Sequence, residues 1–373
     1  MKIDFANLQL QYQTYKDKID SNIQAILNKS NYILGEEVDI LEKELQNFTG
    51  AKYAISCSSG TDALLLAMMA IDIQPDDEII TTPFTWISTA EMIALLKATP
   101  VFVDIEPDTY NIDANLIERV ITKKTKAIMP VSLYGQPPDI DAIQAIANKY
   151  NLKVIIDGAQ SFGSTYKNKK DSNLGDISIT SFFPSKPLGC YGDGGAVFTN
   201  NEDYAKKIKL LRVHGQNKRY YHQYIGIGGR LDTIQAGILL AKLPYFAEEL
   251  KKRQKVGDHY TGGLSNILKT PVIKSERSSS WAQYTLRVKN RDVLQLKLKE
   301  DGIPTSIFYP LPLHLQECFK YLNYKKNIFP VSEKSAAEVI SIPINAFMSN
   351  KTVDFIIDSI KKYSNKKNFN ELY

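Results

Sequence analysis

The chain has 373 residues, of which 43% are hydrophobic and 23% are charged, a balance typical of soluble globular proteins and not of disordered or fibrous ones. Its 46 basic and 41 acidic residues leave a formal charge of only +5, and its short lysine-rich stretches lack the stacking or groove-reading pattern of a nucleic-acid site. We therefore predict no nucleic-acid partner. A chain of this length is expected to form two domains.

The cysteine and histidine residues predict neither disulfides nor a metal site. The three cysteines form no CxxC motif, which favours reduced thiols in a reducing compartment. The four histidines have no metal-ligand spacing, so no metal is predicted. The longest apolar stretch, residues 63–71, is about half the length needed to span a bilayer, and the first residues have no apolar signal core. We expect a cytoplasmic protein without a membrane segment.

Short β-rich runs alternate with helix-period stretches between about residues 52 and 200. Strands alternating with helices are typical of a mainly parallel sheet that is covered on both faces, and ligands of such sheets bind at the carboxyl ends of the strands. The predicted strands are residues 52–56, 78–82, 100–105, 126–132, 153–157, 177–183 and 195–199, and the predicted helices between them are residues 63–71, 89–96, 115–120 and 140–149.

The second part of the chain has a different pattern. A long helical stretch, residues 231–255, connects to a β-like run at 282–288, a helix at 293–300, an extended segment at 303–313, and helices near 332–337 and 353–363. We predict a large α/β domain with an N-terminal arm over residues 1–245. A smaller α+β domain is predicted over residues 246–373.

A turn suited to phosphate binding lies between the first predicted strand and the helix after it. It reads Ser-Ser-Gly-Thr-Asp-Ala over residues 58–63, with Gly60 permitting close approach and Thr61 following it. The first free backbone N–H groups of a helix attract anions, and Ser181, within the predicted strand 177–183, could add a hydroxyl. Any strand-to-helix turn favours Ser, Gly and Thr, so the motif is weak evidence by itself.

Trp86 follows the predicted strand 78–82, where an indole could stack on a flat aromatic cofactor. An isolated tryptophan of this kind is more often part of a core or an interface.

Asp157 ends the predicted strand 153–157. A carboxylate at the end of a buried strand is unfavourable unless it meets a cation, and a protonated pyridine nitrogen is such a cation. The alternative is an aspartate that caps the following helix. The cap is the better interpretation of Asp157 alone, and the functional role becomes the better one when Asp157 is taken together with Lys186.

Lys186 is isolated on a turn rich in Pro and Gly, directly after the apolar run 177–183. The segment reads Ser-Phe-Phe-Pro-Ser-Lys-Pro-Leu-Gly over residues 181–189. Residues that fix or sharply bend the backbone surround this lysine. That setting suits Schiff-base chemistry, in which the amine must meet a carbonyl carbon in one geometry and stay partly unprotonated. A surface turn that happens to contain a lysine is the alternative.

A lysine, an aspartate, a phosphate turn and a stacking ring together indicate pyridoxal 5′-phosphate (PLP). With these motifs the chain resembles the DegT/DnrJ/EryC1/StrS family of sugar-nucleotide aminotransferases, within the aspartate-aminotransferase-like (fold type I) superfamily. The resemblance runs nearly end to end. The segments that carry it are residues 32–35, 59–64, 157–163, 181–195, 230–236 and 309–314.

The resemblance implies a role for each matching position. Lys186 would hold PLP as a Schiff base and move the proton, while Asp157 would pair with the pyridine nitrogen. Gln160 would bind the ring hydroxyl, Gly60, Thr61 and Ser181 the phosphate, and Trp86 the ring face. Arg230 and Tyr309 resemble substrate-binding residues. The family commonly has Asn where this chain has Gly228, so a different group must serve the cofactor phosphate there.

The resemblance also implies the reaction. L-Glutamate would donate an amino group to the 3-keto group of a nucleotide-linked sugar in surface polysaccharide (O-antigen or capsule) biosynthesis, in a homodimer with shared active sites. The substrate it favours is UDP-2-acetamido-2-deoxy-3-oxo-D-glucuronate. A dTDP-3-keto-6-deoxyhexose remains an alternative, and so does a non-catalytic regulator that senses PLP or a nucleotide sugar. A sugar 3-dehydratase is disfavoured, because that branch replaces the Schiff-base lysine by histidine.

Overall fold

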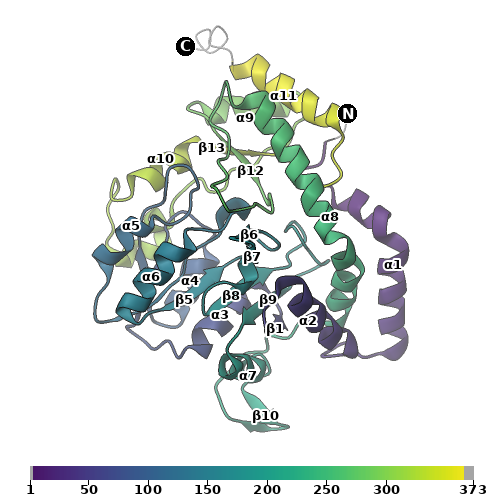
Figure 1. Ribbon diagram of the computed structural model, residues 1–373, viewed down its shortest axis with the longest axis vertical. Coiled ribbons are helices and arrows are strands. Elements are labelled where there is room, and N and C mark those ends of the chain that lie inside the picture. Colours follow the sequence, from purple (N-terminus) through teal and green to yellow (C-terminus); the bar gives the residue numbers. More distant parts are fainter. Residues whose placement is uncertain (1–2, 365–373) are drawn as a thin grey trace.

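The computed structural model describes residues 3–364, and a seven-stranded sheet forms its centre (Figure 1). The strand order is β1-β9-β8-β5-β4-β2-β3. Strands β2, β3, β4, β5 and β8 pair in parallel, whereas β9 is antiparallel to both of its neighbours. The mainly parallel sheet predicted from the sequence is confirmed. The strands are β1 (Tyr53–Cys57), β2 (Glu78–Thr81), β3 (Thr99–Phe102), β4 (Thr125–Ile128), β5 (Lys153–Asp157), β8 (Ile177–Ser181) and β9 (Gly195–Thr199).

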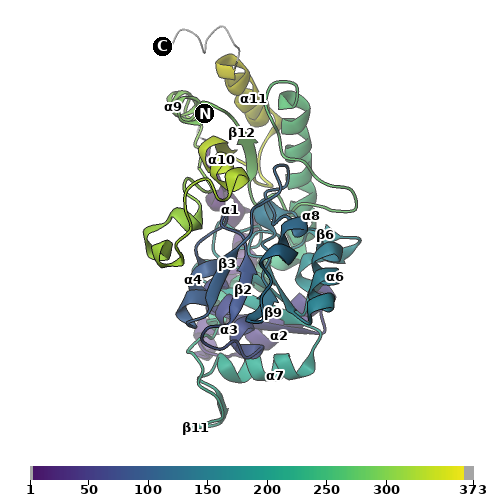
Figure 2. The same ribbon diagram turned by 90° about the vertical axis from the view of Figure 1, so that its left-hand side faces the viewer.

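Helices cover both faces of this sheet (Figure 2). Because side chains alternate along a strand, Ile155 packs with α3, α4 and α7 on one face. Val154 and Ile156 pack with α5 and α6 on the other. The helices of this part are α1 (Leu8–Lys29), α2 (Glu36–Thr49), α3 (Gly60–Ala70), α4 (Ser88–Leu95), α5 (Ala114–Ile117), α6 (Ile140–Tyr150) and α7 (Glu202–Leu211).

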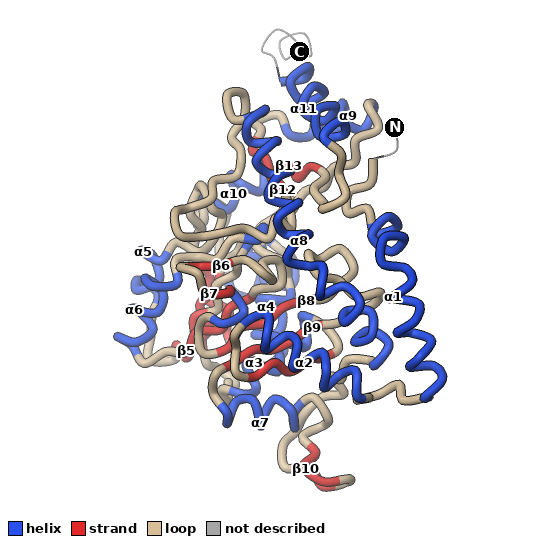
Figure 3. The backbone as a smooth tube through the Cα atoms, turned by 45° about the vertical axis from the view of Figure 1, so that its right-hand side comes forward, coloured by secondary structure: helices blue, strands red, loops and turns tan. Residues whose placement is uncertain are grey.

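Helix α8 (Thr233–Leu264) connects the large sheet to a smaller α+β region (Figure 1). Its first half packs with α2 and α1, which runs beside it (Figure 3). Its last turns bury Val256, Tyr260 and Leu264 in the smaller core. That region contains β12 (Tyr284–Arg287) antiparallel to β13 (Val339–Ile342), with α9 (Arg291–Glu300), α10 (Pro330–Glu338) and α11 (Asn350–Ser364).

Two short hairpins lie outside the large sheet. Strands β6 (Thr165–Tyr166) and β7 (Lys169–Lys170) form one of them. Strands β10 (Gln216–Lys218) and β11 (Tyr221–His222) form the other, which projects from the body of the molecule (Figure 2).

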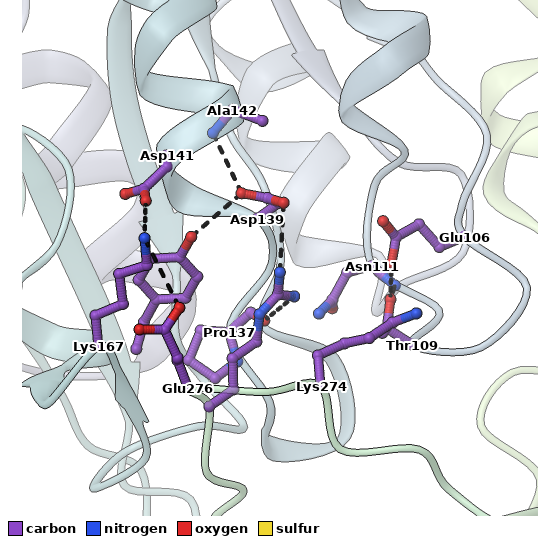
Figure 4. Close-up of polar contacts among 12 residues, drawn as sticks. Glu106, Thr109, Asn111, Pro137, Asp139, Asp141, Ala142, Lys167, Lys274 and Glu276 are labelled. Carbon is purple, nitrogen blue, oxygen red and sulfur yellow. Dashed lines mark hydrogen bonds and ion pairs between the residues drawn. The ribbon is translucent and has the colours of Figure 1, made fainter.

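Polar contacts hold the C-terminal region against the large sheet region. Lys167 Nζ lies 2.6 Å from Asp141 Oδ2 and 3.9 Å from Glu276 Oε2, joining α6 to the loop before β12 (Figure 4). The carboxylate of Asp104 accepts the backbone N–H groups of Val331 and Ser332 at 2.9 Å each, at the start of α10. The division at residues 245 and 246 stays a prediction, and residues 365–373 of the predicted second domain lie outside the described residues.

Within residues 3–364 no helix is long and apolar enough to cross a membrane. In the same range no three His, Cys, Asp or Glu residues gather where they could hold a metal ion.

Candidate active site

The candidate site lies at the carboxyl ends of two neighbouring parallel strands. Strand β5 ends at Asp157 and β8 ends at Ser181, with Asp157 in register with Ile179. The turn that carries Lys186 follows β8 directly. Because parallel strands end at the same edge of a sheet, the structure brings Asp157 and Lys186 together, as the sequence pattern predicted.

Asp157 is a buried carboxylate held by two neutral donors. Its Oδ2 accepts a hydrogen bond from Thr89 Oγ1 at 2.7 Å, and its Oδ1 accepts one from the backbone N–H of Ala159 at 3.2 Å. Loss of solvent raises the pKa of Asp157, while the two hydrogen bonds and the charge of Lys186 act in the opposite direction. The site therefore favours a second cation next to this carboxylate.

Lys186 is fixed by the backbone of its turn. Its N–H donates to Phe183 O at 2.8 Å, and Cys190 N–H donates to Phe182 O at 2.7 Å. A Cβ on Gly189 would lie 2.5 Å from Pro184 O, so this close turn requires glycine there. Loss of solvent lowers the pKa of Lys186, and the charge of Asp157 partly opposes that shift. A larger fraction of the amine is thus unprotonated than in a solvated lysine, as a nucleophilic lysine requires.

Gln160 and Tyr309 line the site beside Asp157. Gln160 Nε2 donates to Tyr309 Oη at 3.1 Å, and Gln160 Oε1 accepts from the backbone N–H of Tyr134 at 2.7 Å. Trp86 lies at the surface next to Tyr309. Its side chain is 58% exposed, and its ring centroid is 6.2 Å from that of Tyr309. Three of the predicted residues therefore come together from the loops after β2 and β5 and from the C-terminal region.

The predicted phosphate turn begins α3. Ser59 caps the helix, its side chain accepting the N–H of Asp62 at 3.0 Å, so the helix starts at Gly60. A Cβ on Gly60 would lie 2.7 Å from Ser181 Cβ. Only glycine lets the end of β8 approach this turn so closely. Thr61 Oγ1 lies 2.9 Å from Ser88 Oγ, which connects the turn to the start of α4.

Replacing Gly60 by alanine is expected to push the helix start away from Ser181 and to weaken binding of a phosphate-bearing cofactor. Crowding of this kind costs about 1–3 kcal/mol of stability. Thermal unfolding of the apoprotein and a titration with PLP would measure the two effects. Gly262→Ala is the matched control, because a Cβ on this helical glycine meets no atom within 4 Å. Equal behaviour of the two variants would contradict the close fit at Gly60.

Arg230 lies near the phosphate turn. The backbone N–H of Ser58 donates to Gly229 O at 3.0 Å, which places the Gly228–Gly229–Arg230 segment beside the turn within one chain. A Cβ on Gly228 would lie 3.2 Å from His214 Nε2 and 3.8 Å from Arg230 Nη2. The imidazole of His214 thus fills the space next to the position where the sequence departs from the family pattern.

Sequence reasoning missed two groups that shape this site. Thr89 donates to Asp157, and the backbone of Tyr134 orients Gln160. Thr89 is the first residue of the predicted helix 89–96, and its hydroxyl was a possible hydrogen-bond donor to a buried group. Tyr134 acts through its main chain, for which its residue type gives no signal.

Pyridoxal phosphate fits these residues chemically. Asp157 has no cation in hydrogen-bond contact within residues 3–364, and a protonated pyridine nitrogen supplies one. In the same range the Nζ of Lys186 has no hydrogen-bond partner, so it is free to meet an aldehyde carbon. The turn at Gly60 and the Ser181 hydroxyl lie together, as a shared phosphate requires. A desolvated lysine near a buried carboxylate on a sheet of this topology is expected of a PLP enzyme of fold type I.

The comparisons with known proteins agree with this class. A model of the DegT/DnrJ/EryC1/StrS aminotransferase family matches residues 13–361. The UDP-2-acetamido-2-deoxy-3-oxo-D-glucuronate aminotransferase of Pseudomonas aeruginosa is 50% identical over 95% of this chain and 98% of its own length. A pleiotropic regulatory protein of Geobacillus stearothermophilus is 41% identical over 97% of this chain and 99% of its own.

Solved structures share the fold. A DegT/DnrJ/EryC1/StrS aminotransferase from Brucella abortus superimposes with a TM-score of 0.95 at 37% identity, covering 98% of this chain and 100% of that one. NtdA from Bacillus subtilis, with bound cofactor PMP, superimposes with a TM-score of 0.90 at 28% identity, covering 97% of this chain and 85% of that one.

The chain belongs to the DegT/DnrJ/EryC1/StrS aminotransferase family. The predictions of the family, the fold type I architecture, the aminotransferase activity and the pyridoxal cofactor are confirmed. The roles of the individual site residues stay predictions.

Proposed function

We propose that this chain transfers an amino group from L-glutamate to the 3-keto group of a nucleotide-linked sugar, with UDP-2-acetamido-2-deoxy-3-oxo-D-glucuronate as the substrate. The observation that carries this proposal is the desolvated amine of Lys186 brought near the buried carboxylate of Asp157 in a chain 50% identical to the Pseudomonas aeruginosa enzyme of that name. The product would serve surface polysaccharide biosynthesis, as O-antigen or capsule.

The side chains divide the work of transamination. When bound, PLP supplies an electron sink for the negative charge left as a proton is removed next to the substrate nitrogen. Lys186 holds the cofactor and then moves that proton, because its lowered pKa lets the amine act as a base and the ammonium as an acid. Asp157 supplies the negative charge that keeps the ring nitrogen protonated.

The remaining predicted residues bind and orient. Gly60, Thr61 and Ser181 hold the phosphate, and Gln160, fixed by the Tyr134 backbone, holds the ring hydroxyl. Trp86 stacks on the ring face. Tyr309 contacts the substrate beside Gln160, where burial raises its pKa and keeps the hydroxyl protonated as a hydrogen-bond donor.

Arg230 supports a substrate with a carboxylate. A uronate carries a negative charge at the far end of the sugar, and a guanidinium recognises a carboxylate through two parallel hydrogen bonds. A dTDP-3-keto-6-deoxyhexose has a methyl group at that position and would gain nothing from Arg230. The choice of the uronate is supported by the 50% identity to the UDP-2-acetamido-2-deoxy-3-oxo-D-glucuronate aminotransferase of Pseudomonas aeruginosa.

An amination assay across a panel of keto-sugar nucleotides tests the substrate. We expect kcat/KM for the UDP-linked 3-keto uronate to exceed that for the dTDP-linked 3-keto-6-deoxyhexose by at least ~10²-fold, the effect of a lost charged contact. Arg230→Met should reduce this preference while leaving the rate with the 6-deoxy sugar nearly unchanged. A preference for the 6-deoxy sugar would contradict the proposed substrate.

A homodimer with shared active sites is part of this proposal. The hairpin of β10 and β11 projects from the body and exposes Tyr220 and Tyr221 at 75% and 64%, and Ile225, just after it, at 92% (Figure 1). Large exposed apolar side chains on one projecting segment favour burial against another chain.

We place the reaction in the cytoplasm, where thiols stay reduced, because Cys57, Cys190 and Cys318 are all free.

A regulator that senses PLP or a nucleotide sugar is the second candidate, because the 41% identical relative is named a pleiotropic regulatory protein. A sensor would not need a lysine able to move protons. Addition of glutamate to the PLP-loaded protein separates the two: a shift of the visible band supports the aminotransferase, and an unchanged spectrum supports the sensor or another amino donor.

A further inference from the structure

A second buried carboxyl, Asp171, lies beside the site and has no part in the mechanism described above. It begins the 3-10 turn Asp171–Asn173 and is 1% exposed. Ser132 Oγ donates to its Oδ1 at 3.1 Å, and Ser161 Oγ donates to its Oδ2. No cation forms an ion pair with this carboxyl in the described part of the chain. Two neutral hydroxyls therefore support a carboxyl that has lost its solvent.

Both serines belong to the loops that hold Asp157. The backbone N–H of Ser132 donates to Asp157 O at 3.0 Å, and that of Ser161 donates to Gly158 O at 3.1 Å. A Cβ on Gly158 would lie 2.9 Å from Asp171 Oδ2 and 2.7 Å from Ile179 O. The Asp171 carboxyl thus packs directly against the residue that follows Asp157.

The other charged groups near this turn are directed elsewhere. Lys170 Nζ donates to Gly163 O at 2.9 Å and lies over the ring of Phe48. Asp176 Oδ2 accepts the N–H of Val154 at 2.8 Å, and its Oδ1 lies 3.7 Å from Lys153 Nζ.

The elements that pack on the turn bring uncharged groups. Strand β8 contributes Ser178, whose Oγ donates to Asp171 O at 3.1 Å, the C-cap of α2 contributes Gly50, and β9, which also packs on the turn, has no charged residue. Asp157 is therefore the charged group that acts on Asp171. Loss of solvent and, to a smaller extent, the charge of Asp157 raise the pKa of Asp171 to about 7, although the two serine hydroxyls oppose the shift.

We propose that Asp171 is a tuning residue of the cofactor site, which holds or releases a proton behind Asp157 and thereby sets how strongly Asp157 stabilises a protonated ring nitrogen. This inference rests on the proposed role of Asp157. The chemistry is one O–H bond: the Asp171 proton is exchanged with solvent, and no other bond changes. When Asp171 is neutral, Asp157 supplies one negative charge to stabilise the ring nitrogen. With Asp171 ionised there are two, and the protonated ring is more stable.

The first test uses the apoprotein and needs no catalysis. The folded-state pKa of Asp171 lies above its unfolded value of about 3.9. The contribution of Asp171 to the free energy of unfolding is therefore highest below that pH, where the carboxyl is neutral in both states, and it falls as pH rises towards about 7. The unfolding midpoint of Asp171→Asn should therefore move upward relative to wild type between about pH 4 and about pH 7, and the difference should stay constant at higher pH. Asparagine fits this place. Its NH2 group cannot accept the hydrogen bond from Ser161, but the Ser161 hydroxyl can donate to Gly158 O, 3.3 Å away, instead.

Asp113→Asn is the matched control, since Asp113 caps α5 by accepting the N–H of Asn115 and asparagine caps equally well. Its midpoint should stay parallel to wild type across the same pH range. A constant difference between Asp171→Asn and wild type from about pH 4 to about pH 7 would overturn the proposal, because a merely structural residue gives parallel curves.

The second test follows the visible absorption of the PLP-loaded protein against pH, without amino donor or sugar. Wild type should show a step near pH 7 that Asp171→Asn lacks. If that variant does not fold, Ser161→Ala decides: loss of one donor to the Asp171 carboxylate should move the step to higher pH. An identical step in wild type and in either folded variant would overturn the proposal. If the step behaves as expected but glutamate leaves the spectrum unchanged, the proposed function fails and this inference stands.

Discussion

Lys186→Ala is expected to lower kcat by at least ~10³-fold, because one side chain both holds the cofactor covalently and transfers the proton. The fold should persist. The turn is held by the backbone N–H of Lys186, which donates to Phe183 O, whereas its Nζ has no hydrogen-bond partner within residues 3–364. Steady-state amination, the visible cofactor band and the unfolding midpoint would measure the three parts of this prediction.

Lys170→Met is the control for that experiment. Loss of solvent also lowers the pKa of Lys170, but its Nζ binds Gly163 O, on the loop after Gln160. This variant should keep most of the wild-type rate and the visible band. A Lys186→Ala protein that is folded and still turns over at more than a small residual rate would refute the assigned role of Lys186.

Asp157→Asn is expected to lower kcat by ~10²–10³-fold, the usual effect of removing one group that stabilises developing charge in a closed site. Asparagine has the same shape and can keep its contacts with Thr89 and Ala159, so the geometry should survive the loss of charge. The visible band should remain, because Lys186 is unchanged.

The same substitution should stabilise the apoprotein at high pH. Burial raises the pKa of Asp157 above its unfolded value, so the ionised carboxylate costs stability that is absent at low pH and grows as pH rises. Asparagine removes this cost. Unfolding midpoints of the apoprotein at low and high pH measure the effect. A variant less stable at every pH but fully active would instead make Asp157 a structural cap of the following turn.

The large sheet was predictable because each strand is short, apolar and bounded by turn residues. The segments at 153–157 and 195–199 agree with β5 and β9 at both ends. Strand β8 ends at Ser181, two residues before the predicted end, because the chain turns there towards Lys186. Asp157 was found because it ends a buried strand, and Lys186 because it is isolated on a turn rich in Pro and Gly.

Two of the elements that sequence reasoning missed, α1 and β13, have a weak local signal. Helix α1 is polar on most of its surface and buries only Gln11, Ile19 and Ile26 against its neighbours. Strand β13 has four residues and follows α10 without a turn residue between them. Helix α8 continues to Leu264, beyond the predicted residue 255, because its last turns build the second core and it tolerates Pro244 inside.

The polar contacts of the site could not be predicted either. The bond from Thr89 to Asp157 joins residues 68 positions apart, and that from Ser132 to Asp171 joins residues 39 apart. Such pairs depend on which strands are neighbours in the sheet. The strand order becomes visible only when the chain is folded.

Reduction of the PLP-loaded protein with borohydride, followed by proteolysis and mass mapping, tests the central assignment most directly. The coenzyme should be found covalently attached to a single peptide, at Lys186. Attachment at another lysine, or no attachment in fully loaded protein, would contradict it.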